Sequence, residues 1–270
     1  MKKTLYITDL DGTFLNSKGE LSHFSASTIN ALIKKGMIFS YATARSIVSA
    51  GKIVKDLCLN VPVIVHNGIF IMDPKTSNIE YGSYLNNDNA KSILKTLYSN
   101  KVYPFSHSII DGEEKISYVI EYINSHTKDF VQERKNDKRL RKCSIDNMCD
   151  GDVFHFTCID DETKLKRMYD MFKNDFQCIY YEDMYSKKMW LEILPKNITK
   201  GASILKLKEL LNCDRVVCFG DGVNDINMFE VSDESYAVKN AKDEIKNIAT
   251  GVIASCDDDG VARFLKEIFK

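Results

Sequence analysis

No stretch of this 270-residue sequence is apolar over the roughly 20 residues that a membrane-spanning helix requires. The formal net charge of −1 creates no overall field that would favour nucleic acid or an anionic membrane surface. The lysines at positions 2 and 3 are not followed by the apolar region of a signal peptide. We therefore expect a cytoplasmic protein whose partners include neither nucleic acid nor a membrane.

The sequence also lacks paired cysteines. Its eight cysteines are scattered and form no Cys-x-x-Cys pair, so neither a zinc site nor a redox motif of that type is indicated. Several of them lie in apolar runs, such as Cys218 within 216–219, where a buried free thiol is expected. This usage of cysteine is typical of a reducing cytoplasm.

The first part of the chain alternates between strand-like and helix-like segments. Short apolar runs predict strands at 3–8, 37–43 and 61–65, and the intervening segments predict helices at 25–35 and 46–57. The second helix is expected to begin at Ser46, and the first at Ser25 or a neighbouring serine. This βαβαβ order at short spacing predicts a parallel sheet with helices on its faces.

The pattern changes after residue 65. Residues 69–72 and 79–81, separated by a turn, predict a hairpin. Residues 84–193 mix helices and strands, and we interpret them as a separate α+β unit inserted into the first domain. Within it we expect helices at 88–98 and 162–176, strands at 102–110, 116–122, 153–159, 178–181 and 189–193, and a solvated helix or loop at 128–142.

The alternating pattern then resumes and continues to the C-terminus. The predicted helices are 200–211, 225–231, 242–249 and 260–269, and the predicted strands are 215–219, 236–238 and 252–254. We therefore predict an α/β fold in which residues 1–83 and 194–270 complete one doubly wound, Rossmann-like parallel sheet. Residues 84–193 would form the inserted domain.

Two carboxylates follow the first predicted strand, in Asp9-Leu10-Asp11-Gly12-Thr13. Ligands bind at the carboxyl ends of the strands in open α/β sheets, and hard oxygen ligands suit Mg²⁺. Taken alone, the same residues are also typical of an ordinary turn, because Asp and Gly are favoured there.

Three later segments favour the ligand site over the turn. Polar residues stand at the ends of further predicted core strands or at the start of a core helix: Thr43 with Arg45, Lys200, and Asp221 with Asn224 and Asp225. Two or three carboxylates could hold Mg²⁺, while a hydroxyl, a lysine and an amide could bind phosphoryl oxygens. The pattern predicts a phosphate site in which catalysis depends on positioning and electrostatics.

In their order and in their residues these motifs resemble those of the haloacid dehalogenase superfamily, in its Cof-type sugar-phosphatase-like branch. The four motifs are 9–13, Thr43 within 42–45, Lys200 within 199–202, and 220–225. Their joint occurrence in this order is highly specific, and the resemblance extends over both core segments. It implies that residues 84–193 form a C2-type cap domain that determines substrate specificity.

The resemblance also implies a role for each matching residue. Asp9 would be the nucleophile that forms an aspartyl-phosphate, and Asp11 the general acid and then the general base. Lys200 would offset the charge between Asp9 and its phosphate. The residues implied for the phosphoryl group are Thr43, Ala44 through its N–H, Lys200 and Asn224. Those implied for Mg²⁺ are Asp9, Asp11 through its backbone carbonyl, Asp221, and Asp225 directly or through the metal's water shell.

The implied function is that of a Mg²⁺-dependent phosphatase acting on small-molecule phosphomonoesters, with sugar phosphates favoured. A phosphosugar mutase and a non-catalytic phospho-ligand sensor are the alternatives. The sensor is disfavoured by the presence of Asp9 and Asp11 together with Lys200 and Asp221. The expected partner is a small-molecule phosphate ester, and the sequence does not indicate the oligomeric state.

Two positions near the second motif stay open at this level. The family usually has glycine where this chain has Ala44, a change that we expect to be tolerated if φ is negative there. Arg45 either pairs with a neighbouring carboxylate or contacts the substrate.

Overall fold

The chain forms two compact units in a computed structural model that describes residues 2–183 and 186–269. The first unit combines Met1–Gly82 with Ile198–Lys270, and the second is the intervening segment Ser83–Asn197. The predicted insert, 84–193, lies within the second unit. Within the described ranges, no helix has both the length and the apolar character needed to cross a membrane.

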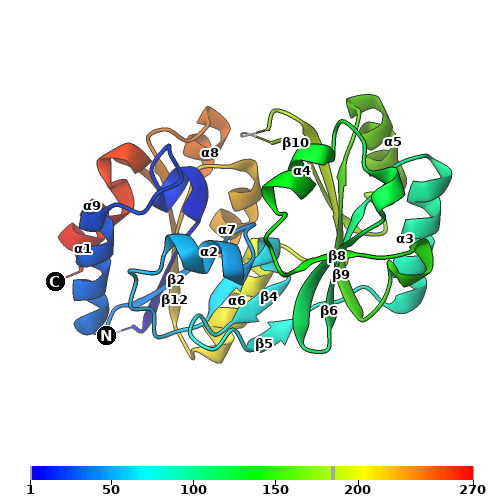
Figure 1. Cartoon of the computed structure of the whole chain (residues 1–270). Helices are drawn as coiled ribbons and strands as arrows, with labels where there is room; N and C mark the ends of the chain where they lie inside the picture. Colours follow the sequence, from blue (N-terminus) through cyan, green and yellow to red (C-terminus); the bar gives the residue numbers. More distant parts are fainter. Residues whose placement is uncertain (1, 184–185, 270) are drawn as a thin grey trace. The chain divides into compact units, whose positions relative to one another are not determined.

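A five-stranded sheet forms the centre of the first unit (Figure 1). Its order is β14-β13-β12-β1-β2, and every neighbouring pair is parallel. The strands are β1 (Thr4–Thr8), β2 (Ile38–Tyr41), β12 (Arg215–Gly220), β13 (Glu234–Val238) and β14 (Gly251–Ile253). Leu5, Ile7 and Thr8 of β1 and every residue of β12 after Arg215 are buried, as expected for a parallel sheet that is covered on both faces. The predicted doubly wound α/β core is therefore confirmed.

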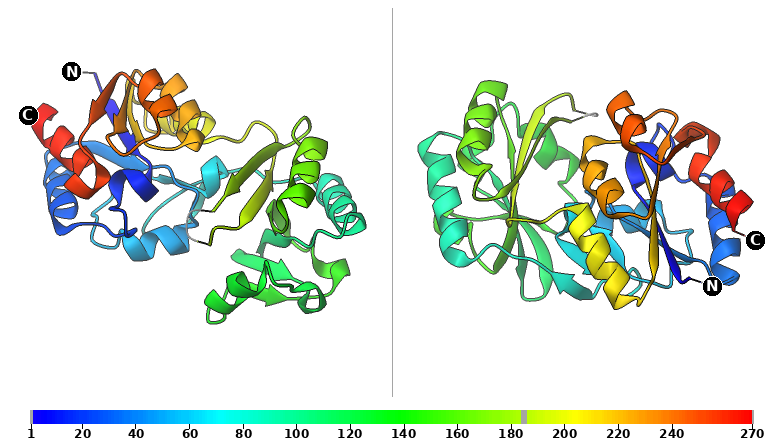
Figure 2. Two further views of the ribbon diagram at one scale, coloured as in Figure 1. Left: turned by 90° about the horizontal axis from the view of Figure 1, so that it is seen from above. Right: turned by 180° about the vertical axis from the view of Figure 1, so that it is seen from behind.

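Helices pack on both sides of this sheet. They are α1 (His23–Lys34), α2 (Ile47–Ile53), α6 (Lys200–Leu210), α7 (Ile226–Val231), α8 (Asp243–Ile248) and α9 (Gly260–Ile268). Helices α1 and α9 lie side by side to one side of β2 and β12, and α6 and α7 lie together on the other (Figures 1 and 2).

Side-chain caps explain where three of these helices begin. The hydroxyl oxygens of Ser22, Ser46 and Thr199 each accept a hydrogen bond from the backbone N–H three residues further along the chain. Each cap satisfies an N–H of the first turn that has no partner within the helix. The start at Ser46 is as predicted, and of the serines proposed for the start of α1, which were Ser25 or a neighbour, Ser22 is the cap. Helix α2 ends at Ile53, before the predicted residue 57.

The third predicted strand exists, but its predicted place in the parallel sheet was wrong. Strand β3 pairs antiparallel with β4 in a separate three-stranded sheet, and it meets the end of β2 only in an isolated parallel bridge between Ala42 and Ile64. The reason is the turn His66–Gly68, whose three residues all have positive φ and reverse the chain directly after β3. The strands of this sheet are β3 (Val63–Val65), β4 (Phe70–Met72) and β5 (Ile79–Gly82).

The second unit contains a six-stranded sheet in the order β10-β11-β9-β6-β7-β8. Its strands are β6 (Phe105–Ile110), β7 (Glu113–Tyr118), β8 (Leu140–Lys142), β9 (Asp152–Ile159), β10 (Gln177–Glu182) and β11 (Met189–Leu194). All neighbours are antiparallel except β7 and β8. The prediction of a helix or loop for 128–142 missed β8, because a three-residue charged edge strand has no apolar alternation to reveal it.

The helices of the second unit are α3 (Asn87–Ser99), α4 (Lys128–Glu133) and α5 (Glu162–Phe172). Apolar residues of α3 and α5 share one core with β9 and β11. A smaller cluster contains Phe130 of α4 together with Phe105 and Ile159 of the sheet. The second unit is therefore an α+β domain with its own core.

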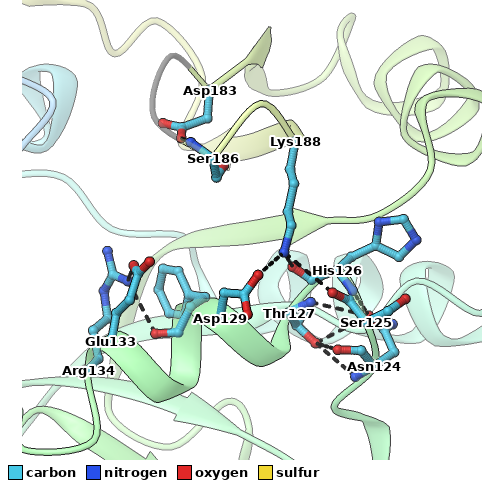
Figure 3. A network of polar contacts seen from close by, with 11 residues as sticks. Asn124, Ser125, His126, Thr127, Asp129, Glu133, Arg134, Asp183, Ser186 and Lys188 are labelled. Atoms are coloured by element: carbon cyan, nitrogen blue, oxygen red, sulfur yellow. Dashed lines mark hydrogen bonds and ion pairs between the residues drawn. The ribbon is translucent and has the colours of Figure 1, made fainter.

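One lysine links the β10–β11 hairpin to the segment that leads into α4 (Figure 3). The Nζ of Lys188 donates to Oδ2 of Asp129 at 2.7 Å and to the carbonyl of His126 at 3.0 Å. The side chain of Asn124 in turn accepts from the N–H of His126 at 2.9 Å. These bonds fix the start of α4 within the second unit.

Candidate active site

Three neighbouring strands of the parallel sheet end at the same level. In the order β12-β1-β2, Thr8 is paired with Phe219 on one side and with Tyr41 on the other. The N–H of Asp9 donates to the carbonyl of Phe219 at 2.9 Å, which extends the ladder by one residue. The residues directly after these strands, among them Asp9 and Asp221, therefore meet at the carboxyl edge of the sheet.

Lys200 reaches this edge from the start of α6. Its side chain is almost completely buried, and its Nζ lies 2.8 Å from Oδ1 of Asp9 and 2.8 Å from Oδ1 of Asp225. Glycine at position 201 lets the start of α6 approach α7 closely, because a Cβ at this position would lie 2.1 Å from the carbonyl oxygen of Asn227. The N–H of Gly201 also donates to Oδ1 of Asn227 at 2.8 Å, which ties α6 to α7.

Asp225 organises the loop after β12 with its second carboxylate oxygen. Its Oδ2 accepts from the N–H groups of Asp221 and Gly222, both at 3.0 Å. A Cβ at Gly220 would lie 2.7 Å from the Cβ of Asp225, so only glycine fits there. Asn224 lies in the same loop, with its Oδ1 2.7 Å from the position that a Cβ on Gly222 would occupy.

Asp221 faces the turn that follows Asp9. Its Oδ1 accepts a hydrogen bond from the hydroxyl of Thr13 at 2.7 Å. Gly12 has a φ of 74°, and a Cβ there would lie 2.5 Å from Oδ2 of Asp221. Glycine is therefore required at position 12 both by its conformation and by the space available.

Negative charge is concentrated in this cluster. Carboxylate oxygens of Asp9, Asp221 and Asp225 all lie within 4.8 Å of one another, and the ammonium of Lys200 lies among them. Burial raises the pKa of Asp9 well above its ordinary value, Lys200 opposes the rise, and Asp225 and Asp221 add to it. Burial and Asp225 likewise raise the pKa of Asp221 to about 6.

The lysine responds to the same charges in the opposite direction. Burial lowers the pKa of Lys200, but Asp225 and Asp9 raise it by more, so the amine stays protonated. One ammonium among three carboxylates leaves an excess of negative charge in a buried place, which a divalent cation would offset. Carboxylate oxygens are also the ligands that suit Mg²⁺, so the residues present fit this ion.

A model of the haloacid dehalogenase-like hydrolases matches residues 6–265 of the sequence. The chain belongs to this family. Among its relatives, 5-amino-6-(5-phospho-D-ribitylamino)uracil phosphatase YwtE of Bacillus subtilis is 28% identical, over 96% of each chain. A second B. subtilis phosphatase with the same substrate in its name, YitU, is 25% identical over 99% of this chain and 98% of its own.

Solved structures agree with this assignment at the level of the fold. The crystal structure of TM0651 from Thermotoga maritima superposes with a TM-score of 0.81 and covers 99% of this chain and 98% of its own, at 24% identity. A parallel core sheet with an α+β unit inserted in its chain is therefore a fold that this protein shares with the solved structure.

The structure brings together four of the residues that the motifs of this family predict: Asp9, Lys200, Asp221 and Asp225. The carboxylate of Asp11 is oriented differently. Its two oxygens accept from Nε and Nη2 of Arg45 at 2.7 and 2.6 Å, so of the two alternatives for Arg45 the structure shows the carboxylate pair. Asp11 as a metal ligand through its carbonyl stays a prediction.

The second motif adds backbone and hydroxyl groups at the end of β2. The N–H of Thr43 donates to the carbonyl of Ile64 at 3.0 Å, and its Oγ1 accepts from the N–H of Arg45 at 3.2 Å. Ala44 is not among the described residues with positive φ, so the methyl group that replaces the usual glycine causes no backbone strain.

Two contacts of this site could not be predicted from the sequence. Thr13 was recognised as part of the first motif, but its hydrogen bond to Asp221 joins residues that are far apart in the chain. Asn240 donates to the backbone of Gly12, and no local pattern marks a loop residue as the partner of a distant carbonyl.

Proposed function

We propose that this haloacid dehalogenase-like hydrolase is a Mg²⁺-dependent phosphatase of small-molecule phosphomonoesters that works through an aspartyl-phosphate. The observation that carries the proposal is the position of Asp9. Its buried carboxylate is held by Lys200 at the carboxyl edge of the sheet, beside two further carboxylates. This combination suits a nucleophile that must approach an anionic phosphoryl group.

In the first step an oxygen of Asp9 attacks phosphorus. A bond forms between Asp9 and phosphorus while the bond from phosphorus to the ester oxygen breaks, and the departing oxygen takes a proton from Asp11. Lys200, 2.8 Å from the Asp9 carboxylate, offsets the repulsion between this carboxylate and the phosphate. Thr43, the N–H of Ala44 and Asn224 would bind the phosphoryl oxygens.

In the second step water attacks the phosphorus of the Asp9 phosphate. Asp11 accepts the water proton and the Asp9–phosphorus bond breaks, which releases inorganic phosphate and regenerates the free Asp9 carboxylate. Because Arg45 binds both oxygens of the Asp11 carboxylate, Asp11 must leave this ion pair before it exchanges a proton with the substrate.

Asp9, Asp221 and Asp225 would hold Mg²⁺, with the carbonyl of Asp11. Bound there, the ion would neutralise charge on the phosphoryl oxygens. The chain's own carboxylates supply the hard oxygen ligands, and Lys200 keeps the metal-free cluster from being entirely negative.

For the substrate, we propose a phosphorylated sugar or sugar alcohol. The two B. subtilis relatives named above act, by their names, on a phosphoribityl compound, and both match almost the whole of this chain. We further infer that the second unit, which interrupts the core between the second and third motifs, recognises the part of the substrate that leaves.

A phosphate-release screen tests this function. The full chain is assayed with sugar phosphates, sugar-alcohol phosphates, nucleotides and cofactor phosphates, each with Mg²⁺ and with EDTA. We expect release that requires Mg²⁺ and is fastest with the sugar and sugar-alcohol esters. Release that EDTA leaves unchanged, or no release from any ester, would contradict the proposal.

A further inference from the structure

Asn240 connects two segments of the first unit that are distant in the sequence. It lies in the loop after β13, and its Nδ2 donates to the carbonyl of Gly12 at 2.7 Å. Its Oδ1 accepts from the N–H of Cys256 at 2.9 Å and from the hydroxyl of Ser255 at 3.2 Å. The amide nitrogen therefore donates to the turn after Asp9, and the amide oxygen accepts from residues 255 and 256.

The turn that Asn240 contacts is irregular. Asp11 and Gly12 have non-helical backbone angles inside the turn Leu10–Phe14, which is closed by a hydrogen bond from the N–H of Leu15 to the carbonyl of Leu10 at 2.8 Å. The carbonyl of Gly12 belongs to the peptide that continues to Thr13. The hydrogen bond from Asn240 to that carbonyl thus restricts rotation of the Gly12–Thr13 peptide, whose orientation sets the position of the Thr13 side chain.

The position of this peptide matters for the carboxylate cluster. Thr13 donates to Asp221 at 2.7 Å, and Gly12 leaves so little room that a Cβ would lie 2.5 Å from the same carboxylate. A rotation of the peptide would therefore displace Asp221 or break its hydrogen bond.

We infer that Asn240 is a positioning residue, which sets the Gly12–Thr13 peptide against Asp221 and so fixes the geometry of the carboxylate cluster. This inference deepens the proposed function and rests on it. Asn240 acts through Gly12 and Thr13: within the described residues its side chain bonds to Gly12, Ser255 and Cys256, and not to Asp9 or Lys200.

The substitution Asn240→Asp separates the two functions of the amide. The carboxylate retains an oxygen for the N–H of Cys256 but loses the donor, so that an anion faces the carbonyl of Gly12. If Asn240 only held its own loop, this variant would behave almost like the wild type.

Asn30 offers a matched control. Its Nδ2 donates to the carbonyl of Asp56 at 2.7 Å, and its Oδ1 accepts from the N–H of Cys58 at 2.7 Å. The residue therefore bridges α1 to another segment with the same pair of bonds, away from the carboxylate cluster. Asn30→Asp changes the same atoms and measures the purely structural effect.

The experiment compares wild type, Asn240→Asp and Asn30→Asp by kcat and KM for p-nitrophenyl phosphate and by the rise in Tm on titration with Mg²⁺. Small displacements of a catalytic arrangement lower rates strongly, so we expect Asn240→Asp to reduce kcat about tenfold or more with KM changed less than about twofold. It should also need several times more Mg²⁺ for half of the Tm rise. Asn30→Asp should lower Tm without changing either quantity.

A kcat for Asn240→Asp within about twofold of wild type, or an equal loss in Asn30→Asp, would overturn the inference. Should the wild type show no Mg²⁺-dependent turnover, the proposed function fails, and the Mg²⁺ titration alone decides on Asn240. An unchanged half-point in Asn240→Asp then contradicts the positioning role, and a raised half-point supports it.

Discussion

Replacement of Lys200 by methionine removes the ammonium that contacts two of the three clustered carboxylates, those of Asp9 and Asp225. The ammonium lies 2.8 Å from both Asp9 and Asp225, and the side chains of Lys200, Asp9 and Asp225 are each at most 8% exposed. Removal of one partner from a buried ion pair costs about 3–5 kcal/mol, because the remaining charge is left without compensation. For a unit of about 150–250 residues this loss lowers Tm by about 6–20 °C.

The same variant should respond more strongly to Mg²⁺ than the wild type. With the ammonium gone, the carboxylates of Asp9, Asp221 and Asp225 carry more uncompensated negative charge, so the binding of a divalent cation stabilises the folded state by more. We therefore expect a lower Tm in EDTA, a larger rise in Tm on addition of Mg²⁺, and loss of phosphate release.

Lys206→Met is the control for this experiment. It makes the same lysine-to-methionine change on the same helix, α6, where Lys206 makes an exposed ion pair with Glu209 at 2.9 Å. Contacts of this kind contribute under about 1 kcal/mol. The reasoning would be refuted if Lys200→Met lowered Tm no more than Lys206→Met, or if Mg²⁺ raised the Tm of Lys200→Met by less than that of the wild type.

Two further results are expected from the same site. Because the pKa of Asp221 is raised to about 6, the folded protein retains a proton that the unfolded chain releases at lower pH. In EDTA, the stability that the protonated Asp221 contributes is therefore lost as pH rises through about 6, whereas the Mg²⁺-induced rise in Tm grows over the same range. Thermal melts at about pH 5 and 7.5 measure both trends, and the opposite trends would contradict the prediction. Gly12→Ala should abolish Mg²⁺-dependent activity, because its Cβ would lie 2.5 Å from Oδ2 of Asp221. The control is Gly36→Ala, at a position with a φ of 99° where a Cβ would have no atom within 4 Å. It should lower the free energy of unfolding in a denaturant melt by only about 1–2 kcal/mol and keep its activity. Equal effects of the two glycine substitutions on kcat would show that the close approach to Asp221 is unimportant.

The sequence could predict the main positions of the site because they follow from periodicity. Asp9 and Asp221 each come directly after a short apolar strand, and parallel strands bring such positions to one edge of the sheet. Lys200 was predicted at the start of a core helix by its motif and its apolar neighbours, and the structure shows the capping hydroxyl of Thr199 there.

Choices among partners were not predictable in the same way. Arg45 could have served a carboxylate or a substrate, and only the folded chain shows its two-point contact with Asp11. Strand β3 has the composition of a central parallel strand, but the reversal at His66–Gly68 places it in another sheet. Asn240 reaches Gly12 across 228 residues of sequence, so no local pattern could reveal the bond.

The central claim is that the Asp9 carboxylate attacks phosphorus, and the most direct measurement is the Mg²⁺-dependent kcat of Asp9→Asn on p-nitrophenyl phosphate. An exposed aspartate of the same unit, replaced in Asp56→Asn, controls for the change of acid to amide. We expect Asp9→Asn to keep the circular dichroism spectrum of the wild type and to release no phosphate above the rate without enzyme, while Asp56→Asn retains full activity. Mg²⁺-dependent hydrolysis by Asp9→Asn within about tenfold of the wild-type rate would contradict the mechanism.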